Sequence, residues 1–154
     1  MTASPSECAG QILETVPLVM LAIRSEMRSH RDTDLSVPQF RVLVYLNRFE
    51  GASLSDIAEH MGLTLPSMSK MIDGLVARRL VTRRMHPGDR RRITLAPTAR
   101  GRTEMQSAYQ ATESRLAERL AALPLEKRLI ILEAMQVLKG IFASNREGKT
   151  AAGK

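Results

Sequence analysis

The stretch SLSDIAEHMGLTLPSMSKMIDGLVARRL, residues 53–80, decides the fold. Ser55 can cap a short helix, because a serine side chain accepts a hydrogen bond from the free N–H groups of a first helical turn. Gly62 then supplies a turn, and Thr64 can cap a second helix that tolerates Pro66 in its first turn. Two short helices joined by a glycine-containing turn predict a helix-turn-helix, whose second helix enters the major groove of DNA.

The second helix has an apolar side that we expect to be buried, formed by Met68, Met71, Ile72, Leu75 and Val76. Its other sides carry small or flexible hydrogen-bond donors in the half that would enter the groove, Ser67, Ser69 and Lys70. Pro66 can contact a thymine methyl group, and the helix that starts near Ser55 can meet a phosphate with its N-terminus. The alternative is that Thr64 and Ser67 only cap the helix and that Lys70 is an ordinary surface residue.

A second stretch, LVTRRMHPGDRRRITL at residues 80–95, follows directly. Two runs with strand character, 80–82 and 92–95, flank a Pro-Gly-Asp turn and predict a β-hairpin. Because like charges repel, folding gains little from its five arginines, Arg83, Arg84, Arg90, Arg91 and Arg92. A hairpin tip is narrow enough to approach a minor groove, where arginine is attracted by the negative potential. The alternative is a solvated loop with ordinary surface arginines.

Helical segments enclose this region on both sides. Apolar residues at three- and four-residue spacing predict helices at 11–31, with a kink or a delayed start at Pro17, at 38–49, from a cap at Thr98 to about residue 122, and at 125–142. In the helix at 38–49 we expect four inward side chains, Phe40, Leu43, Val44 and Leu46. The predicted parts are an N-terminal dimerisation helix (1–33), a winged helix-turn-helix domain (34–103), C-terminal dimerisation helices (104–145) and a flexible tail (146–154).

Composition supports this division. The 154 residues are 44% hydrophobic and 3% aromatic, so the core must consist mostly of aliphatic residues and methionine. The net charge is +7, and residues 34–103 carry twelve Arg or Lys against six Asp or Glu. This balance favours a polyanionic partner, either nucleic acid or an anionic membrane. We find no apolar run near the roughly 20 residues that span a bilayer, and no signal-peptide layout, and therefore expect a cytoplasmic protein without a membrane partner.

The order of these motifs resembles the MarR family of bacterial winged helix-turn-helix repressors. The resemblance rests on VPQFRVLVYL (37–46), the helix-turn-helix, HPGDRRRITL (86–95) and TARG (98–101), and covers roughly residues 10–142. Its most specific part is the reader helix followed at fixed distance by Gly-Asp-Arg-Arg-Arg. One departure is Pro97, where the family more often has an apolar strand residue.

The resemblance implies a mainly α fold with a small β-hairpin wing, and a homodimer whose first and last helices intertwine. It implies that Arg90 or Arg91 inserts into the minor groove, and that Asp89 orients this arginine through a charge-assisted pair that also involves Arg83 or Arg84. It also implies that a small apolar or phenolic anion can release the DNA, which would be a pseudo-palindromic operator in the nucleoid of a bacterium or archaeon.

Several residues allow further readings. Met20, Met27, Met61 and Met71 can line an effector cavity, although core filling explains them as well. Arg24 and Arg28 lie one helical turn apart and can hold a ligand carboxylate, or form a surface or inter-subunit ion pair. We interpret Cys8 as an ordinary cysteine of an irregular lead segment, although some relatives sense peroxide with an N-terminal thiol. The three histidines, His30, His60 and His86, lack a second ligand at helical or turn spacing.

The sequence shows no nucleophile, base and orienter at motif spacing and no phosphate-cradling glycine loop, so we expect neither enzyme activity nor a cofactor. The predicted function is a ligand-responsive transcriptional regulator that binds double-stranded DNA as a homodimeric repressor. The alternatives are a non-specific nucleoid- or RNA-associated protein, and a metal- or redox-responsive member of the same fold.

Overall fold

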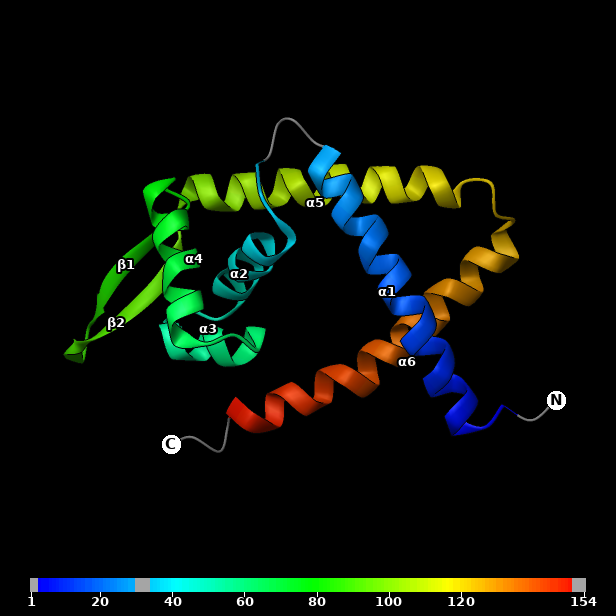
Figure 1. Cartoon of the computed structure of the whole chain (residues 1–154), viewed down its shortest axis with the longest axis horizontal. Coiled ribbons are helices and arrows are strands. Elements are labelled where there is room, and N and C mark those ends of the chain that lie inside the picture. The colour runs from blue at the N-terminus through cyan, green and yellow to red at the C-terminus, as the bar shows by residue number, and fades with distance from the viewer. Residues whose placement is uncertain (1–2, 30–33, 151–154) are drawn as a thin grey trace. The chain divides into compact units, whose positions relative to one another are not determined.

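The computed structural model describes residues 3–29 and 34–150, with side chains up to residue 143 (Figure 1). Six helices and one hairpin follow in the order α1 (Pro5–Ser29), α2 (Val37–Arg48), α3 (Leu54–Met61), α4 (Leu65–Ala77), β1 (Val81–His86), β2 (Asp89–Pro97), α5 (Ala99–Leu120) and α6 (Leu125–Thr150). The predicted mainly helical fold with a β-hairpin is confirmed. The chain forms two compact units, residues 1–115 and 116–154.

Capping side chains set where α2 and α3 begin. The Ser36 hydroxyl accepts a hydrogen bond from the N–H of Gln39 at the start of α2, where Pro38 lies in the first turn. Ser53, not Ser55, caps α3: its hydroxyl accepts from the N–H of Asp56 (3.2 Å), and the Asp56 carboxylate accepts from the N–H of Ser53 (2.8 Å). The prediction for Ser55 was wrong, because only Ser53 has an acidic residue three positions later to complete the capping box.

The second helix of the predicted helix-turn-helix, α4, begins where it was predicted. Gly62 ends α3 in the left-handed conformation, with φ of 67°, which glycine adopts without steric cost. The Thr64 hydroxyl caps α4 and accepts from the N–H of Ser67 (3.4 Å). Helix, turn and second helix therefore form at the positions that the caps indicate.

Helix α1 begins at Pro5, six residues before the predicted start. A capping box that we missed explains this, since the Ser4 N–H donates to the Glu7 carboxylate (2.7 Å) and the Glu7 N–H donates to the Ser4 hydroxyl (3.1 Å). The hydrogen bond from the Ser4 N–H to the Glu7 carboxylate, followed by that of the Ser4 side chain, lowers the pKa of Glu7 below its ordinary value. Pro17 lies inside the helix and does not delay its start. Cys8 is consequently an exposed residue of α1 and not part of an irregular lead segment.

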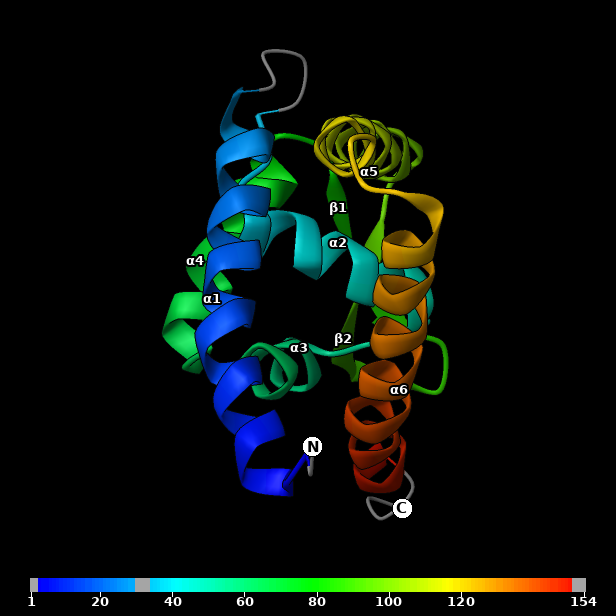
Figure 2. The ribbon, with the colours of Figure 1, turned by 90° about the vertical axis from the view of Figure 1, so that its right-hand side faces the viewer.

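The core lies where α2, α3 and α4 surround the base of the hairpin (Figures 1 and 2). It contains Met68, Ile72 and Leu75 of α4 and is completed by residues from every neighbouring element: Met27, Leu35, Val37, Val42, Leu43, Leu46, Ala52, Ile57, Ala58, Leu80, Val81, Leu95 and Ala108. Met20, Met61 and Met71 pack against it half-buried, as core filling predicts. In α2 the prediction for Val44 was wrong. Val44 is 41% exposed, whereas Val42 is fully buried.

The two strands are antiparallel and longer than predicted. Their register pairs Val81 with Pro97 at the base of the hairpin, so Pro97 ends β2 and does not shorten it. The N–H of Leu95 donates to the carbonyl of Ala52, just before α3, over 2.8 Å. This bond and the buried Val81 and Leu95 fix the base of the hairpin to the helix-turn-helix.

The junction between the hairpin and α5 is tightly packed. The Thr98 hydroxyl donates to the carbonyl of Arg79 (2.7 Å) and accepts from the N–H of Gly101 (2.9 Å), which confirms Thr98 as the cap of α5. The N–H of Thr98 donates to the carbonyl of Leu80. A Cβ atom on Gly101 would overlap this carbonyl oxygen, so only glycine fits at this position.

Helix α6 runs to Thr150, eight residues beyond the predicted end at residue 142. The predicted flexible tail, residues 146–154, therefore begins within this helix, and its last four residues lie outside the described part of the chain. The apolar side chains of α6 are exposed in the single chain: Leu125, Leu129, Ile130, Leu132, Met135, Val137, Ile141 and Phe142.

Helix α1 also exposes large apolar residues: Leu13, Val16, Leu18, Val19 and Leu21. By length and composition it is apolar enough to cross a membrane, which the sequence analysis did not expect. Its C-terminal part packs Met20, Ile23 and Met27 against the core of the helix-turn-helix unit. Because one end of α1 packs against the core, its exposed apolar residues are also consistent with a contact to another protein surface instead of a membrane.

We predict that Gly101→Ala lowers the free energy of unfolding by about 3 kcal/mol, because the new methyl group must displace backbone and not a flexible side chain. Chemical denaturation followed by circular dichroism measures this change. Gly74→Ala is the matched control, since a Cβ at Gly74 meets nothing within 4 Å and alanine favours a helix by about 1 kcal/mol. Equal stability of the two variants would contradict the close approach at Gly101.

Candidate nucleic-acid interface

Helix α4 buries one side and exposes the other. Met68, Ile72 and Leu75 anchor it in the core. Pro66, Ser67 and Lys70 lie on the exposed side, whereas Ser69 is half-buried. Since residues three and four apart share a helix face, Ser67, Lys70 and Asp73 form one stripe, here called the α4 stripe. Most of the predicted reader residues are thus available to an external partner.

Thr64 and Ser67 also have a structural role at the start of α4. The Thr64 hydroxyl donates to the Ser67 hydroxyl (3.0 Å) while it accepts from the N–H of Ser67. Thr64 is therefore a helix cap, and its own hydrogen-bonding groups are engaged. Ser55 is exposed in the first turn of α3, close to the N-terminal N–H groups of that helix.

The tip of the hairpin carries three arginines in an unpaired segment. His86 pairs with Asp89, and Met85 pairs with Ile93, so the register shifts between Met85 and His86. Within the hairpin, which the structure describes completely, this register gives no β1 partner to the three residues between Asp89 and Ile93: Arg90, Arg91 and Arg92. All three are exposed. The extra residues bulge out of the ladder and present their side chains to solvent.

Asp89 holds this bulge through the backbone. Its carboxylate accepts a hydrogen bond from the N–H of Arg91 (2.9 Å). Among the described residues Asp89 forms no ion pair, so the predicted pair with Arg90 or Arg91 and with Arg83 or Arg84 is absent. Arg83 pairs instead with Asp73 of α4. The sequence places Asp73 ten residues before Arg83, and only the packing of the hairpin against α4 brings the two together.

The Asp73–Arg83 pair joins the two halves of the interface. Arg83 lies on β1 and Asp73 on the exposed side of α4, and both remain partly open to solvent. An exposed ion pair contributes little stability by itself. Its geometric effect is to hold β1 of the wing beside the α4 stripe.

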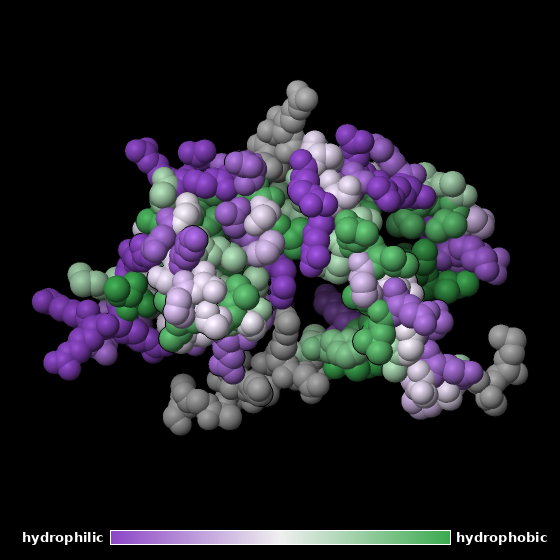
Figure 3. Space-filling model, viewed as in Figure 1, coloured by the Kyte–Doolittle hydropathy of each residue, from purple (hydrophilic) through white to green (hydrophobic). Residues whose placement is uncertain are grey.

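The other arginines of this region fall into two groups, those that contact the rest of the fold and those that are exposed without an ion pair to a described residue. Arg78 donates to the carbonyl of Asp34 (2.9 Å) and forms an ion pair with Glu104 (3.6 Å), so it belongs to the fold. Arg84 is exposed, as are the three arginines of the bulge. Among the described residues these four form no ion pair. Figure 3 shows the hydrophilic wing tip projecting from the rest of this unit.

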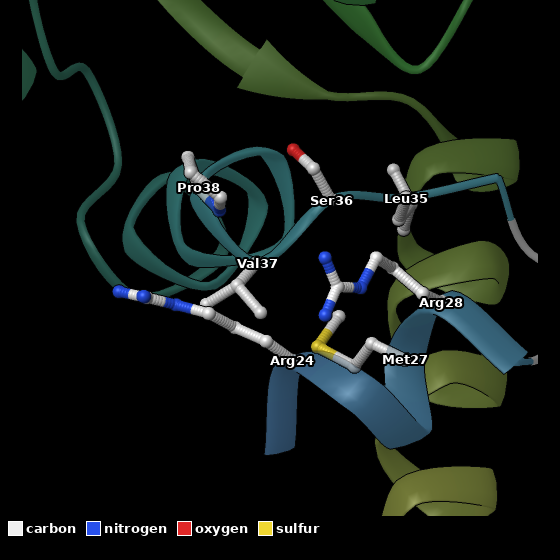
Figure 4. A pocket seen from close by; sticks show the side chains of 7 residues that line it. All are labelled: Arg24, Met27, Arg28, Leu35, Ser36, Val37 and Pro38. Atoms are coloured by element: carbon white, nitrogen blue, oxygen red, sulfur yellow. The ribbon is translucent and has the colours of Figure 1, made fainter. Parts of the chain in front are cut away.

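Three of the four predicted effector residues line one pocket. Arg24, Met27 and Arg28 of α1 enclose a cavity of about 190 Å³ with the segment 35–38 (Figure 4). Met20 does not line it. The Arg28 guanidinium points toward Met27 and Val37, whereas Arg24 extends past Val37 in another direction, so the two groups do not converge on one carboxylate.

A second pocket was not anticipated from the sequence. Phe40 and Val44 of α2 and Met105, Gln106 and Tyr109 of α5 line about 200 Å³. The exposure of Val44, opposite to the prediction, is explained by this pocket. Its lining comes from helices more than fifty residues apart, so no local pattern signals it.

The residues considered for metal or redox chemistry are dispersed. His60 stacks on Tyr45, with ring centroids 4.4 Å apart, and the His86 ring accepts a hydrogen bond from the N–H of Gly88 (3.1 Å). Burial, with the charges of Asp56 and Glu59, raises the pKa of Tyr45. His30 lies outside the described residues. Within 3–29 and 34–150, no three His, Cys, Asp or Glu residues are grouped to hold a metal ion.

Comparison with known proteins finds one family repeatedly. The model of the MarR family matches residues 33–92, from the connector before α2 to the last arginine of the wing. The "Uncharacterized HTH-type transcriptional regulator YfiV" of Bacillus subtilis (strain 168) is 30% identical over 105 residues, which is 68% of this chain and 66% of that relative, just under two thirds of its length.

Solved structures share the fold over nearly the whole chain. RV1404 from Mycobacterium tuberculosis has a TM-score of 0.77 at 22% identity, covering 92% of this chain and 95% of that one. The transcriptional repressor CouR, bound to a 23-mer DNA duplex, has a TM-score of 0.67 at 24% identity and covers 91% and 99%. CouR from Rhodococcus jostii RHA1 bound to p-coumaroyl-CoA has a TM-score of 0.66 at 24% identity, covering 91% and 95%.

The helix-turn-helix, the arginine-rich wing and these matches lead to one conclusion. Residues 33–92 form a winged helix-turn-helix of the MarR family, and the chain is similar in sequence and fold to HTH-type transcriptional regulators.

Proposed function

We propose that the protein is a homodimeric repressor that binds a pseudo-palindromic operator and releases it when a small ligand binds. The observation that carries this proposal is the joined surface of the α4 stripe and the wing, held together by Asp73 and Arg83. One element has the size and polarity for a major groove, and the other is a narrow cationic tip suited to a minor groove.

On the operator, Ser67, Ser69 and Lys70 face the base edges and phosphates of the major groove, with Pro66 in reach of a thymine methyl group. Ser55 and Thr64 lie at helix N-termini, where N–H groups attract phosphate. Arg90 or Arg91 enters the adjacent minor groove, while Arg84 and Arg92 contact its phosphates. Arg83 and Asp89 position these side chains through Asp73 and the N–H of Arg91. In a dimer, two such half-sites lie about 10 base pairs apart.

A second copy of the chain would bury the exposed apolar residues of α1 and α6 in a dimer interface. A single chain leaves many large aliphatic side chains of these helices in water. Isolated apolar residues on a surface are normal, but runs along a helix mark an interface. The symmetry of a two-fold dimer also matches the symmetry of a pseudo-palindrome.

The proposed effector is an apolar or phenolic anion that binds the pocket of Arg24, Met27 and Arg28. The cavity of about 190 Å³ has a mostly apolar lining beside the Arg28 guanidinium, which suits a small aromatic carboxylate held by this one arginine. CouR, a protein of the same fold, has been solved bound to p-coumaroyl-CoA. A ligand that fits a dimer with misaligned readers shifts the population away from the DNA-binding form.

A non-specific nucleoid- or RNA-binding role is the second candidate, because the wing arginines alone attract any polyanion. The ratio of operator affinity to random-duplex affinity at physiological salt separates the two, and a ratio near one favours the non-specific role. In either role the protein acts in the cytoplasm, at the nucleoid.

We predict that Arg90→Ala combined with Arg91→Ala weakens binding to the duplex upstream of the protein's own gene. Each lost phosphate contact lowers the slope of log affinity against log salt by about 0.9, so the dimer loses about 2 to 4. Fluorescence anisotropy over a range of salt concentrations measures both quantities. The control is Arg100→Ala, which removes an exposed arginine that pairs with Glu104 away from the tip. An unchanged slope in the double variant would contradict the role of the wing.

We predict that the wild-type protein sediments as a dimer at micromolar concentration, and that Leu13→Glu with Ile141→Glu shifts it toward the monomer. Both side chains are more than half exposed in the single chain, and a buried unpaired carboxylate is costly at an interface. Sedimentation velocity at several concentrations measures the equilibrium. A wild-type monomer at these concentrations rules out the proposed homodimer.

A further inference from the structure

Two large apolar side chains face solvent on the wing. Met85 is 68% exposed and Ile93 is 53% exposed. The two residues are cross-strand partners, and theirs is the last regular pair before the bulge. Their neighbours in sequence toward the tip are charged or polar, so the pair is an apolar island next to Arg84 and Arg92. A cross-strand pair of this kind stabilises a hairpin only weakly.

The pair lies on the side of the hairpin that looks toward α4. Side chains alternate along a strand, so Val81, Arg83 and Met85 of β1 share one face, and the register adds Leu95 and Ile93 of β2. Near the base this face is buried, with Val81 and Leu95 in the core. One step outward, Arg83 reaches Asp73 of α4. Met85 and Ile93 are the next step on the same face, about 7 Å beyond Arg83 along the strand.

The α4 stripe and the apolar pair are therefore parts of one surface. Asp73 belongs to the α4 stripe and also holds the hairpin, and the tip of β1 and β2 projects beyond α4 (Figure 1). In the proposed DNA complex, with Lys70 in a major groove, this face of the wing would lie against the wall of the next minor groove. The charges on both sides of the pair, on β1 and in the bulge, favour a polyanion at this place.

We propose that Met85 and Ile93 form an apolar contact with duplex DNA, packing against the deoxyribose rings that line the minor groove entered by the wing. This inference rests on the proposed DNA-binding function and adds to it a contact that is not electrostatic. Sugar edges offer apolar surface between phosphates, and Met and Ile are among the apolar side chains that minor-groove proteins bring into this groove, where they wedge between base steps. Binding then removes from water an island that the fold leaves exposed.

This contact makes a distinct contribution to affinity. Arginine contacts release counterions, so their contribution falls as salt rises. Burial of apolar surface is non-directional and releases no counterions. Loss of the pair should therefore lower affinity by the same factor at every salt concentration and leave the salt slope unchanged.

The test is Met85→Thr with Ile93→Thr, because threonine retains strand propensity while it removes most of the apolar surface. We expect operator affinity, measured by fluorescence anisotropy at several salt concentrations, to fall at least tenfold at each with an unchanged slope. The control is Met85→Leu with Ile93→Val, which keeps an apolar pair and should retain wild-type affinity within about threefold. Thermal unfolding of both variants checks that the hairpin and core persist.

Each other outcome is also decisive. Wild-type affinity in the threonine variant overturns the inference, while a reduced salt slope in the variant that lacks Arg90 and Arg91 leaves the proposed function intact. A threonine variant with a reduced salt slope shows displaced arginines and equally overturns the apolar contact. If the wild type prefers no duplex but binds vesicles of anionic phospholipid through Met85 and Ile93, both this inference and the proposed function fail.

Discussion

Met68, Ile72 and Leu75 of α4 and Val81 and Leu95 of the hairpin are buried in one apolar core. This shared burial constrains α4 and the hairpin at once. Because α4 must turn its apolar side inward, Ser67 and Lys70 are left outward. Because the base of the hairpin is anchored in the same core, its alternating side chains place Arg83 beside Asp73. The close approach of Gly101 to Leu80 then starts α5 directly behind the wing.

The wing arginines divide into those the fold uses and those it leaves open. Arg78 binds the carbonyl of Asp34 and Glu104, and Arg83 binds Asp73. Arg84 and the three arginines of the bulge remain exposed. These four arginines repel one another in the free protein. An external polyanion would reduce this repulsion. The Asp89 carboxylate instead accepts a hydrogen bond from the backbone N–H of Arg91 and forms no ion pair with these four arginines.

The sequence predicts most of the local structure, since helix caps and turns act within a few residues. Gly62, Thr64 and Thr98 fall where expected, and a closer reading of the capping boxes at Ser4 and Ser53 would have corrected two helix starts. Contacts between distant elements were less predictable. The partner of Arg83 depends on how the hairpin packs against α4, and the inward phase of α2, with Val42 in place of Val44, depends on the angle at which α2 meets the core.

The proposed function requires the α4 stripe and the wing to contact two grooves of one duplex, and the most direct test is to map where they touch it. Hydroxyl-radical cleavage reports the minor-groove sugars, and methylation of guanine N7 reports the major groove. For a bound operator we expect two major-groove protections about 10 base pairs apart, flanked on both outer sides by protected minor-groove sugars. Uniform weak protection without fixed positions, or protection of one groove only, would contradict simultaneous engagement by α4 and the wing.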